Sequence, residues 1–363
     1  MKAAVLYEPN QPVVVEDIEM EAPRKGEILV KMAATGVCHS CYHVVTGLLT
    51  PPLPTVLGDE GAGVVEEIGE GVTLVKPGDH VILSWMESCG HCIYCVQGRS
   101  NLCLAGREKE EGFLPDGTTR YKKNGKSIHH FATVASFAEY SVIPETCAVP
   151  IDRKIPLDKA ALIGCSVTTG VCAATNTAQV RPGSSVAVFG AGGIGLNVIQ
   201  GAAIAGAEKI IAVDLLASKL AFALEFGATH TVNADHVDPI EAIHALTDGL
   251  GVEYSFEAIG ARTTYEQALY ALRNGGTAVW VGAPPREPLS FDAGVVFWGE
   301  KTVKGCCYGS SRSRFDMPRL LALYRAGILK LDELITQTYR LEEVNTAFKD
   351  MLDGKVARGM ILL

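Results

Sequence analysis

The stretch Gly190-Ala191-Gly192-Gly193-Ile194-Gly195 determines the fold expected for the second half of the chain. It follows a strand-like apolar run, Val186–Phe189, and opens a helix expected over Ile194–Ala205. Asp214 lies about 20 residues further on, at the end of the next expected strand, Lys209–Val213. A G-x-G-x-x-G pattern in this strand–turn–helix context, followed by an acidic residue at this distance, predicts a dinucleotide-binding site.

Each glycine of this loop has a physical reason. Gly190 permits a tight turn, Gly192 lets the backbone approach a pyrophosphate, and Gly195 allows the helix to pack closely on the strand. The N–H groups at the start of the helix would face the phosphates. The cofactor-binding residues expected here are Gly190, Gly192, Gly193, Ile194, Gly195 and Asp214. An aspartate at the adenosine ribose would repel a 2′-phosphate, so the loop favours NAD over NADP.

Composition excludes several classes of protein. The chain of 363 residues is long enough for two domains, and its 48% hydrophobic and 20% charged residues are typical of a globular protein. A net charge of −9 argues against a nucleic-acid or membrane partner. The N-terminus has no apolar stretch of signal-peptide length, and the 11 cysteines therefore suggest a reducing, cytoplasmic setting.

The amino-acid composition of the chain changes near Pro156. Residues before Pro156 are rich in glycine, proline and short Val/Ile runs, which predicts a barrel-like β region. Expected strands and helices then alternate, including a helix over Thr263–Leu272, which predicts a doubly wound parallel sheet. A helix over Met317–Arg325 and the closing segment Met360–Leu363 look like a return to the first domain. The predicted fold class is therefore α/β, with a β domain over 1–166 and 308–363 and a nucleotide-binding domain over 167–307.

Four cysteines lie within 15 residues in the pattern C-x-x-C-x-x-C-(x7)-C. Four thiolates can close around one tetrahedral Zn²⁺ and leave no position for a substrate, so the site is expected to be structural. An iron–sulfur cluster is the alternative, although the last gap is long for one. The residues are Cys89, Cys92, Cys95 and Cys103.

These features together resemble the zinc-dependent medium-chain alcohol dehydrogenases over essentially the whole chain. The resemblance rests on the order of the β domain, the four cysteines, Gly164-Cys-Ser-Val-Thr-Thr-Gly170 and the glycine loop. The stretch Leu114–Val142 is most similar to the long-loop group, which includes liver-type and glutathione-dependent formaldehyde dehydrogenases. The resemblance implies a GroES-like catalytic domain, a Rossmann NAD-binding domain, pairing into a homodimer or homotetramer, and reversible oxidation of a primary or secondary alcohol.

The resemblance also implies a second, catalytic zinc. Cys38 and Cys165 match two of its ligands, and Ser40 and His43 match a relay that carries the alcohol proton away. When bound, the zinc lowers the pKa of the alcohol and NAD accepts the hydride. The cofactor contacts carried over from the family are His39 and Arg358 at the pyrophosphate, Lys219 near the ribose and Thr169 near the nicotinamide, and Val281 is a further expected cofactor-binding residue.

Two positions depart from the family pattern. The usual Gly-His-Glu triplet is Gly58-Asp59-Glu60, and the Asp three residues after the first cysteine ligand is Cys41. In the family these two residues touch, which suggests one correlated change. Asp59 is the expected third ligand, with Glu60 or an absent metal as alternatives. Cys41 is expected to be a buried thiol, although with Cys38, Asp59 and Cys165 it could instead close a four-ligand site.

The substrate pocket is assigned by the same resemblance to Trp85, Ala132 and Tyr308. Two other functions stay open at this point. One is a metal-independent NAD(P)H reductase of carbonyls or activated C=C bonds, and the other is a non-catalytic NAD(H)-binding zinc protein.

Overall fold

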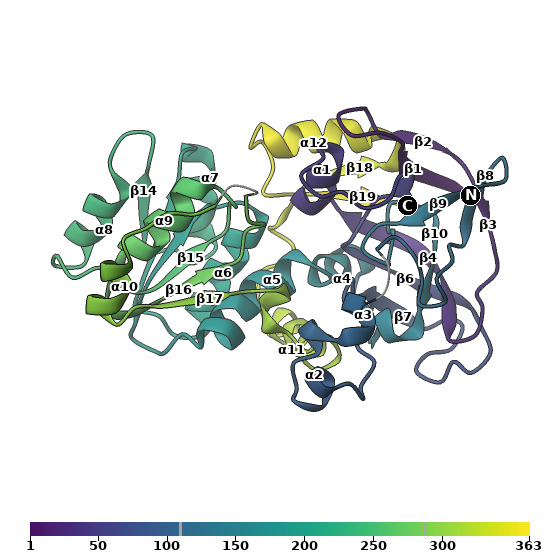
Figure 1. The fold of residues 1–363 in the computed structure, drawn as a ribbon, viewed down its shortest axis with the longest axis horizontal. Helices are drawn as coiled ribbons and strands as arrows, with labels where there is room; N and C mark the ends of the chain where they lie inside the picture. Colours follow the sequence, from purple (N-terminus) through teal and green to yellow (C-terminus); the bar gives the residue numbers. More distant parts are fainter. Residues whose placement is uncertain (109–110, 286–287) are drawn as a thin grey trace. The chain divides into compact units, whose positions relative to one another are not determined.

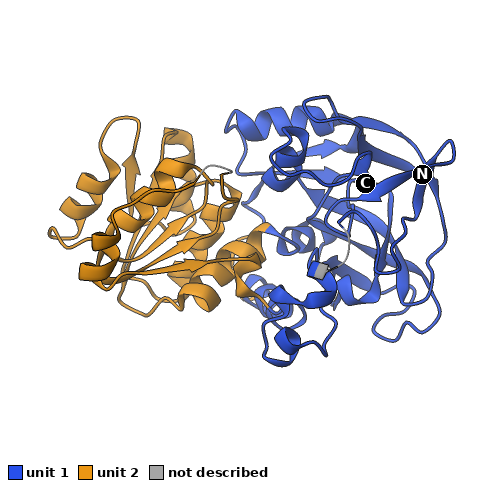
Figure 2. Cartoon of the chain, viewed as in Figure 1, with its two compact units in different colours: residues 1–165, 312–325, 331–363 blue, residues 166–311, 326–330 orange. Residues whose placement is uncertain are grey.

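A computed structural model describes residues 1–108, 111–285 and 288–363. These residues form two compact units, coloured separately in Figure 2. Unit 1 comprises Met1–Cys165, Arg312–Arg325 and Leu331–Leu363, and unit 2 comprises Ser166–Ser311 and Ala326–Lys330. The C-terminal segment therefore belongs mainly to the same unit as the N-terminus.

Unit 1 is built on two sheets, most of whose strands are labelled in Figure 1. The first has the order β2-β1-β5-β9-β8-β3 and contains β1 (Lys2–Leu6), β2 (Val14–Asp17), β3 (Glu19–Met20), β5 (Thr55–Val56), β8 (Tyr121–Lys123) and β9 (Lys126–His130). The second has the order β11-β7-β6-β4-β19-β18, with β10 also paired to β4. It contains β4 (Glu27–Gly36), β6 (Gly61–Ile68), β7 (His80–Leu83), β10 (Tyr140–Pro144), β11 (Ala148–Ile151), β18 (Ile335–Arg340) and β19 (Arg358–Leu362).

Strand β4 is the centre of the second sheet because β6 and β19 both pair with it antiparallel. Most of its residues are buried, as expected of a strand covered on both faces. The helices of this unit are α1 (His39–Val45), α2 (Ile93–Val96), α3 (Leu104–Glu108), α4 (Leu157–Ile163), α11 (Ser313–Arg325) and α12 (Val344–Leu352), with 3-10 turns at Ser100–Leu102, Glu145–Cys147 and Leu341–Glu343.

Unit 2 is a parallel sheet of order β14-β13-β12-β15-β16-β17. Its strands are β12 (Ser185–Phe189), β13 (Lys209–Asp214), β14 (His230–Asn233), β15 (Val252–Glu257), β16 (Leu272–Trp280) and β17 (Thr302–Gly305). Its helices are α5 (Ser166–Cys172), α6 (Gly193–Ile204), α7 (Ala217–Glu225), α8 (Pro239–Leu246), α9 (Arg262–Tyr270) and α10 (Ala293–Gly299), with a π-helical turn at Ala173–Ala178 and a 3-10 turn at Tyr308–Ser310. The chain winds outward from β12 in both directions, so right-handed crossovers place helices on both faces of the sheet. The predicted doubly wound sheet is therefore confirmed.

Two element boundaries differ from the prediction. The helix expected to run to Leu272 ends at Tyr270, and Leu272 opens β16 as the buried partner of Val252. An apolar residue such as Leu272 is compatible with both helical and strand periodicity. Its pairing with Val252 in the sheet places it in the strand. The helix expected from Met317 begins at Ser313, where Asp316 accepts a hydrogen bond from the backbone N–H of Arg312 at 2.8 Å.

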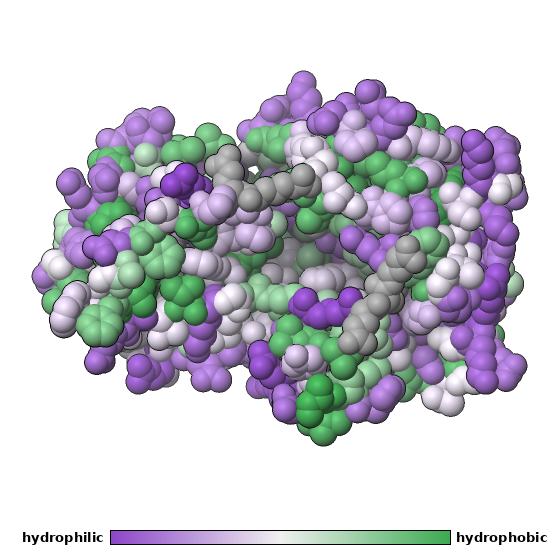
Figure 3. All heavy atoms as spheres, viewed as in Figure 1, coloured by the Kyte–Doolittle hydropathy of each residue, from purple (hydrophilic) through white to green (hydrophobic). Residues whose placement is uncertain are grey.

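The face of the molecule drawn in Figure 3 mixes polar and apolar side chains, seen as interleaved purple and green residues. Large apolar side chains that are exposed include Val96, Phe297 and Trp298. Among the described residues no single helix is long and apolar enough to cross a membrane. One bent pair of helices, Leu157–Ile163 with Ser166–Ala178, has the length and apolar composition of a membrane span, and nothing beyond length and composition supports that reading.

Candidate functional site

The glycine loop of unit 2 joins β12 to α6, as the sequence predicts. Gly190 has a φ of +95°, and Gly192 is the residue before α6. The backbone N–H of Ala191 donates to Oδ2 of Asp214 at 2.8 Å, so the loop and the acidic residue at the end of β13 are joined directly. The other oxygen, Oδ1, accepts from the N–H of Leu216 at 3.1 Å.

The space around the three motif glycines differs from one glycine to the next. A Cβ on Gly195 would lie 1.7 Å from the carbonyl oxygen of Gly190, and a Cβ on Gly190 would lie 2.5 Å from the Ile259 side chain. A Cβ on Gly192 would meet nothing within 4 Å. The backbone at Gly192 thus borders open space at the N-terminal end of a 12-residue helix, which fits a phosphate-bearing cofactor.

The other residues of unit 2 predicted to contact the cofactor or substrate lie at four places. Lys219 lies in the first turn of α7, Thr169 is buried in α5, and Val281 directly follows β16. Tyr308 is buried in the turn Tyr308–Ser310, which packs closely on α5: a Cβ on Gly309 would lie 2.9 Å from the Thr169 carbonyl oxygen.

Glu257 was missed by the sequence analysis, although it ends β15 at the carboxyl edge of the sheet, where dinucleotide sites lie. It is fully buried, and its Oε1 accepts hydrogen bonds from the N–H groups of Ile259 and Gly260 and from the hydroxyl of Thr264. Its Oε2 has no hydrogen-bond partner among the described residues. Burial raises the pKa of this carboxyl. Its backbone oxygen accepts from the N–H of Val281 at 2.9 Å, so Glu257 is held beside a predicted cofactor contact.

The four-cysteine motif forms one cluster in unit 1, in which the four Sγ atoms lie within 4.8 Å of one another. The Sγ atoms of Cys89 and Cys95 are 3.9 Å apart, close to the roughly 3.8 Å edge of a ZnS₄ tetrahedron with Zn–S bonds of about 2.3 Å. Backbone N–H groups also point at the sulfurs: that of Cys89 lies 3.3 Å from Cys103 Sγ and that of Cys92 lies 3.4 Å from Cys89 Sγ. Donors of this kind stabilise thiolates, and the cluster therefore fits a closed tetrahedral zinc site.

A second cluster forms where β4, β6 and β19 run side by side. Cys38 follows β4, Asp59 and Glu60 precede β6, and Arg358 opens β19. The backbone N–H of Gly36 donates to the Glu60 carbonyl oxygen at 2.7 Å, which ties the two strand ends together. A Cβ on Gly36 would lie 2.0 Å from Oε1 of Glu60, so glycine is required there.

Cys165, at the end of unit 1, completes this cluster. The ligand atoms of Cys38, Glu60 and Cys165 lie within 4.8 Å of one another, and all three residues are buried. Oδ2 of Asp59 lies 3.7 Å from Cys165 Sγ, which is close to the roughly 3.5 Å expected between a sulfur and an oxygen ligand of one tetrahedral zinc. The ligand atoms brought within 4.8 Å of one another thus belong to Cys38, Glu60 and Cys165, and Asp59 approaches this set at Cys165.

Glu60 is already paired. Arg358 Nε lies 3.0 Å from Oε1 of Glu60 and its Nη2 binds Oε2, so the guanidinium engages both carboxylate oxygens. Arg358 is 4% exposed. Burial alone would lower the pKa of Arg358, but the charges of Glu60 and Cys38 raise it well above its usual value. This pairing leaves Asp59 as the carboxylate without a cationic partner among the described contacts.

The electrostatics of the cluster favour a cation. A hydrogen bond from Cys165 lowers the pKa of Cys38 to about 5, and the charge of Arg358 acts in the same direction. Burial and the charge of Cys38 raise the pKa of Asp59 to about 7. Cys165 has its pKa raised by its hydrogen bond to Cys38 and by burial. Several acidic groups thus share one buried place with a single guanidinium, a deficit of positive charge that a divalent ion would correct.

The proton-relay residues lie on α1, which starts directly after Cys38. Ser40 donates a hydrogen bond to Oδ2 of Asp59, and His43 follows one turn later on the same face. Burial lowers the pKa of His43, and its Nδ1 has no hydrogen-bond partner among the described residues. His39, at the start of the helix, is exposed.

Trp85 and Ala132 border the same place. Both are partly buried and pack against the apolar cluster that contains Cys38, Cys41 and Cys165. This position suits side chains that limit the space near the two thiols.

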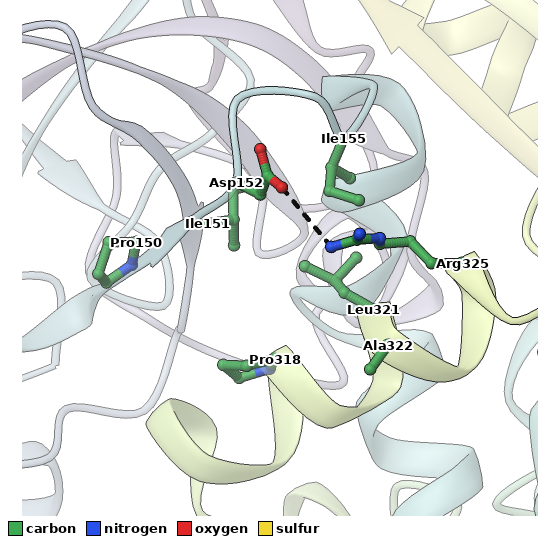
Figure 4. Close-up of a pocket in the computed structure, with 8 residues that line it drawn as sticks. All are labelled: Pro150, Ile151, Asp152, Ile155, Pro318, Leu321, Ala322 and Arg325. Atoms are coloured by element: carbon green, nitrogen blue, oxygen red, sulfur yellow. Dashed lines mark ion pairs between the residues drawn. The ribbon is translucent and has the colours of Figure 1, made fainter.

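A surface pocket lies elsewhere in unit 1, between β11 and α11 (Figure 4). Asp152 and Arg325 form an ion pair of 3.6 Å across it. Its lining contains none of the predicted site residues; it consists of Pro150, Ile151, Asp152, Ile155, Pro318, Leu321, Ala322 and Arg325.

Comparisons with known proteins show which families the two parts of the chain match. Residues 24–153 match the family described as alcohol dehydrogenase GroES-like domain, and residues 193–325 match the zinc-binding dehydrogenase family. A relative from Amycolatopsis methanolica, an NDMA-dependent alcohol dehydrogenase, is 44% identical over 99% of this chain and 98% of its own length.

Two solved structures are similar over the full chain. An alcohol dehydrogenase zinc-binding domain protein from Burkholderia ambifaria has a TM-score of 0.94 at 38% identity, covering 100% of this chain and 98% of its own. A benzyl alcohol dehydrogenase from Acinetobacter calcoaceticus has a TM-score of 0.94 at 34% identity, covering 100% of this chain and 99% of its own. The predicted fold class, a GroES-like domain with a Rossmann domain, is confirmed by these matches and by the sheet order of unit 2.

Proposed function

Because the chain belongs to the zinc-dependent medium-chain alcohol dehydrogenases, we propose that it oxidises a primary or secondary alcohol reversibly, with NAD as hydride acceptor. The metal site we propose is Cys38, Asp59 and Cys165, with Glu60 held aside by Arg358. The observation that supports this set most directly is the 3.7 Å between Oδ2 of Asp59 and Cys165 Sγ.

When bound, zinc would supply a Lewis acid to the alcohol oxygen and NAD would supply the hydride acceptor. The chain's own residues would hold and move the proton. Ser40 hydrogen-bonds the proposed ligand Asp59, so its hydroxyl is fixed beside the metal site. His43 is kept neutral by burial at ordinary pH and can accept a proton one helical turn further along.

The choice of NAD rests on Asp214. Its carboxylate is anchored by the N–H groups of Ala191 and Leu216 and can still accept ribose hydroxyls, whereas a 2′-phosphate would meet a negative charge. The name of the Amycolatopsis relative specifies dependence on NDMA, so the test of acceptor must include that compound beside free NAD.

The test is an assay of the purified chain on aliphatic and benzylic alcohols, with NAD, NADP or NDMA, together with its zinc content. Turnover with zinc at both cysteine sites is the expected result. Reductase activity with zinc only at the four-cysteine site would favour a metal-independent reductase. Zinc at both sites with NAD binding and no turnover would favour a non-catalytic zinc protein.

We also expect the chain to pair into a homodimer or homotetramer. β17 ends the unit 2 sheet and pairs with β16 alone among the described strands, so its outer edge is available for pairing with a strand of another chain. Phe297 and Trp298, just before it in sequence, are 71% and 82% exposed. Light scattering during size-exclusion chromatography would measure the molar mass of the protein in solution. A monomer would contradict this expectation.

A further inference from the structure

The two oxygens of Asp59 face different partners. Oδ2 accepts the hydrogen bond from Ser40 and lies 3.7 Å from Cys165 Sγ. Oδ1 lies 3.6 Å from Sγ of Cys41. The carboxylate is therefore oriented, with one oxygen toward the Cys165 thiol and the other toward a thiol outside the cluster of proposed ligands.

The surroundings of Cys41 suit a hydrogen-bond donor. It has no exposed surface, and it lies in the first turn of α1 within the apolar cluster that contains Val44, Leu57 and Phe137. An ordinary cysteine thiol, with a pKa of about 8–9, carries its proton at neutral pH, so the S–H of Cys41 can face the oxygen that lies 3.6 Å away. A thiol is a weak donor, but Cys41 and Asp59 are both buried, and a hydrogen bond is electrostatically stronger inside a protein than in water.

The chemistry of a metal ligand decides which partner it needs. An imidazole ligand carries an N–H on its far side and needs an acceptor there, whereas a carboxylate ligand carries a bare oxygen and needs a donor. Asp59 is a carboxylate, and the residue on its far side is a donor. The identities of residues 41 and 59 are therefore complementary to each other.

We propose that Cys41 is a positioning residue, whose S–H donates to Oδ1 of Asp59 and so presents Oδ2 as a single-oxygen ligand to the ion between Cys38 and Cys165. This inference rests on the proposed function in one respect, that Asp59 belongs to the metal site. It goes further in assigning a role to a thiol that neither binds the ion nor touches the reactant.

The test measures metal affinity rather than activity. The full-length chain and its variants are loaded with zinc or cobalt, affinity is measured by chelator competition, and the cobalt–thiolate absorption reports on the ligand set. Cys41→Ala should weaken binding at the Cys38 site about 10- to 100-fold, the usual cost of losing a residue that orients a ligand. Cys41→Ser keeps a donor and should retain affinity within a few-fold. Cys147→Ala, which removes another fully buried thiol of unit 1, is the matched control and should leave affinity unchanged.

A reciprocal exchange sharpens the test. Cys41→Asp alone should weaken binding more than Cys41→Ala, because it places two carboxylates together. Adding Asp59→His to Cys41→Asp should restore affinity, because the imidazole N–H then finds an acceptor.

Wild-type affinity in Cys41→Ala, or equal losses in Cys41→Ala and Cys41→Ser, would overturn the inference. The result for Asp59→Asn separates this failure from failure of the proposed site. If Asp59→Asn keeps wild-type affinity and the wild-type cobalt spectrum, then Asp59 is not a ligand and the metal set itself is wrong. If it loses the ion while Cys41→Ala does not, only the role of Cys41 is wrong.

Discussion

Arg358 and Glu60 lie 298 residues apart in sequence and form a buried ion pair in which the guanidinium engages both carboxylate oxygens. Their exposures are 4% and 0%. The pair fastens the start of β19 to the start of β6, beside the two thiols. Arg358 therefore has a structural role in addition to the cofactor contact that the family resemblance implies.

Replacing Arg358 should therefore destabilise unit 1. Arg358→Met leaves the Glu60 charge buried without a partner, and we expect a loss of about 3–5 kcal/mol in the free energy of unfolding. Denaturant unfolding monitored by intrinsic fluorescence measures this. Arg325→Met removes an exposed ion pair with Asp152 and should cost about 1 kcal/mol or less. Equal effects of the two changes would contradict this account of the pair.

The buried carboxyl of Glu257 makes a prediction about pH. Its folded pKa is raised above the ordinary 4.5, so the folded chain holds this proton more tightly than the unfolded chain. The free energy of unfolding should consequently fall as pH rises from about that value through the folded pKa. Glu257→Gln keeps an acceptor for Ile259, Gly260 and Thr264 and removes the charge, so it should be at least as stable as the wild type at neutral pH.

The measurement is the melting temperature of the metal-loaded, cofactor-free chain across the acid-to-neutral range. Glu266→Gln, on α9 at a surface ion pair with Arg262, is the control. A wild-type pH dependence in Glu257→Gln would argue against the burial of an ionisable group at this strand end.

Two glycines of the nucleotide loop should respond differently to alanine. Gly195→Ala would bring Cβ to 1.7 Å from a backbone oxygen, which the loop cannot relieve, so we expect unit 2 to lose at least about 1–3 kcal/mol of stability. Gly192→Ala meets nothing within 4 Å and should fold normally, but its methyl group would occupy the space expected for the pyrophosphate.

Calorimetry with NAD, together with thermal unfolding, distinguishes the two variants. Gly192→Ala should keep its melting temperature and bind NAD at least about tenfold more weakly. Undiminished NAD binding by Gly192→Ala would place the cofactor elsewhere.

The four-cysteine cluster should hold its metal independently of the other site. Cys103→Ser removes one of four thiolates, and we expect that variant to lose the structural ion, to melt at a lower temperature and to keep the metal at Cys38 and Cys165. Mass-spectrometric metal content, with Cys147→Ala as the matched control, measures this. Loss of both ions together would mean that the two sites are not separate.

Local patterns allowed most of the fold to be predicted from sequence. The glycine loop predicted the β12–α6 turn, because strand, turn and helix are adjacent in the chain, whereas the hydrogen bond from Ala191 to Asp214 was not predicted. The spacing of Cys89, Cys92, Cys95 and Cys103 likewise predicted a cluster that the structure confirms.

Long-range contacts could not be predicted in this way. Cys38 and Cys165 are brought together by strands and helices far apart in sequence, and only the family resemblance associated them. The family resemblance assigned Arg358 to the cofactor pyrophosphate. Nothing in the local sequence indicates that Glu60 lies beside it. Glu257 carried no motif, and its burial follows only from the position of β15 inside the sheet.

The contact between Cys41 and Asp59 involves the two positions at which the sequence departs from the family pattern. The family resemblance suggested one correlated change at the two positions, and the structure places Cys41 Sγ 3.6 Å from Oδ1 of Asp59. The roles of the thiol as donor and of the carboxylate as ligand stay predictions.

Anomalous diffraction at the zinc edge, on crystals of the metal-loaded protein, tests the central claim most directly. The account predicts a peak about 2.3 Å from the sulfurs of Cys38 and Cys165 and about 2.0–2.2 Å from an oxygen of Asp59, with one position open. A peak whose carboxylate ligand is Glu60, an ion enclosed by four side chains, or no peak between the two sulfurs would contradict it.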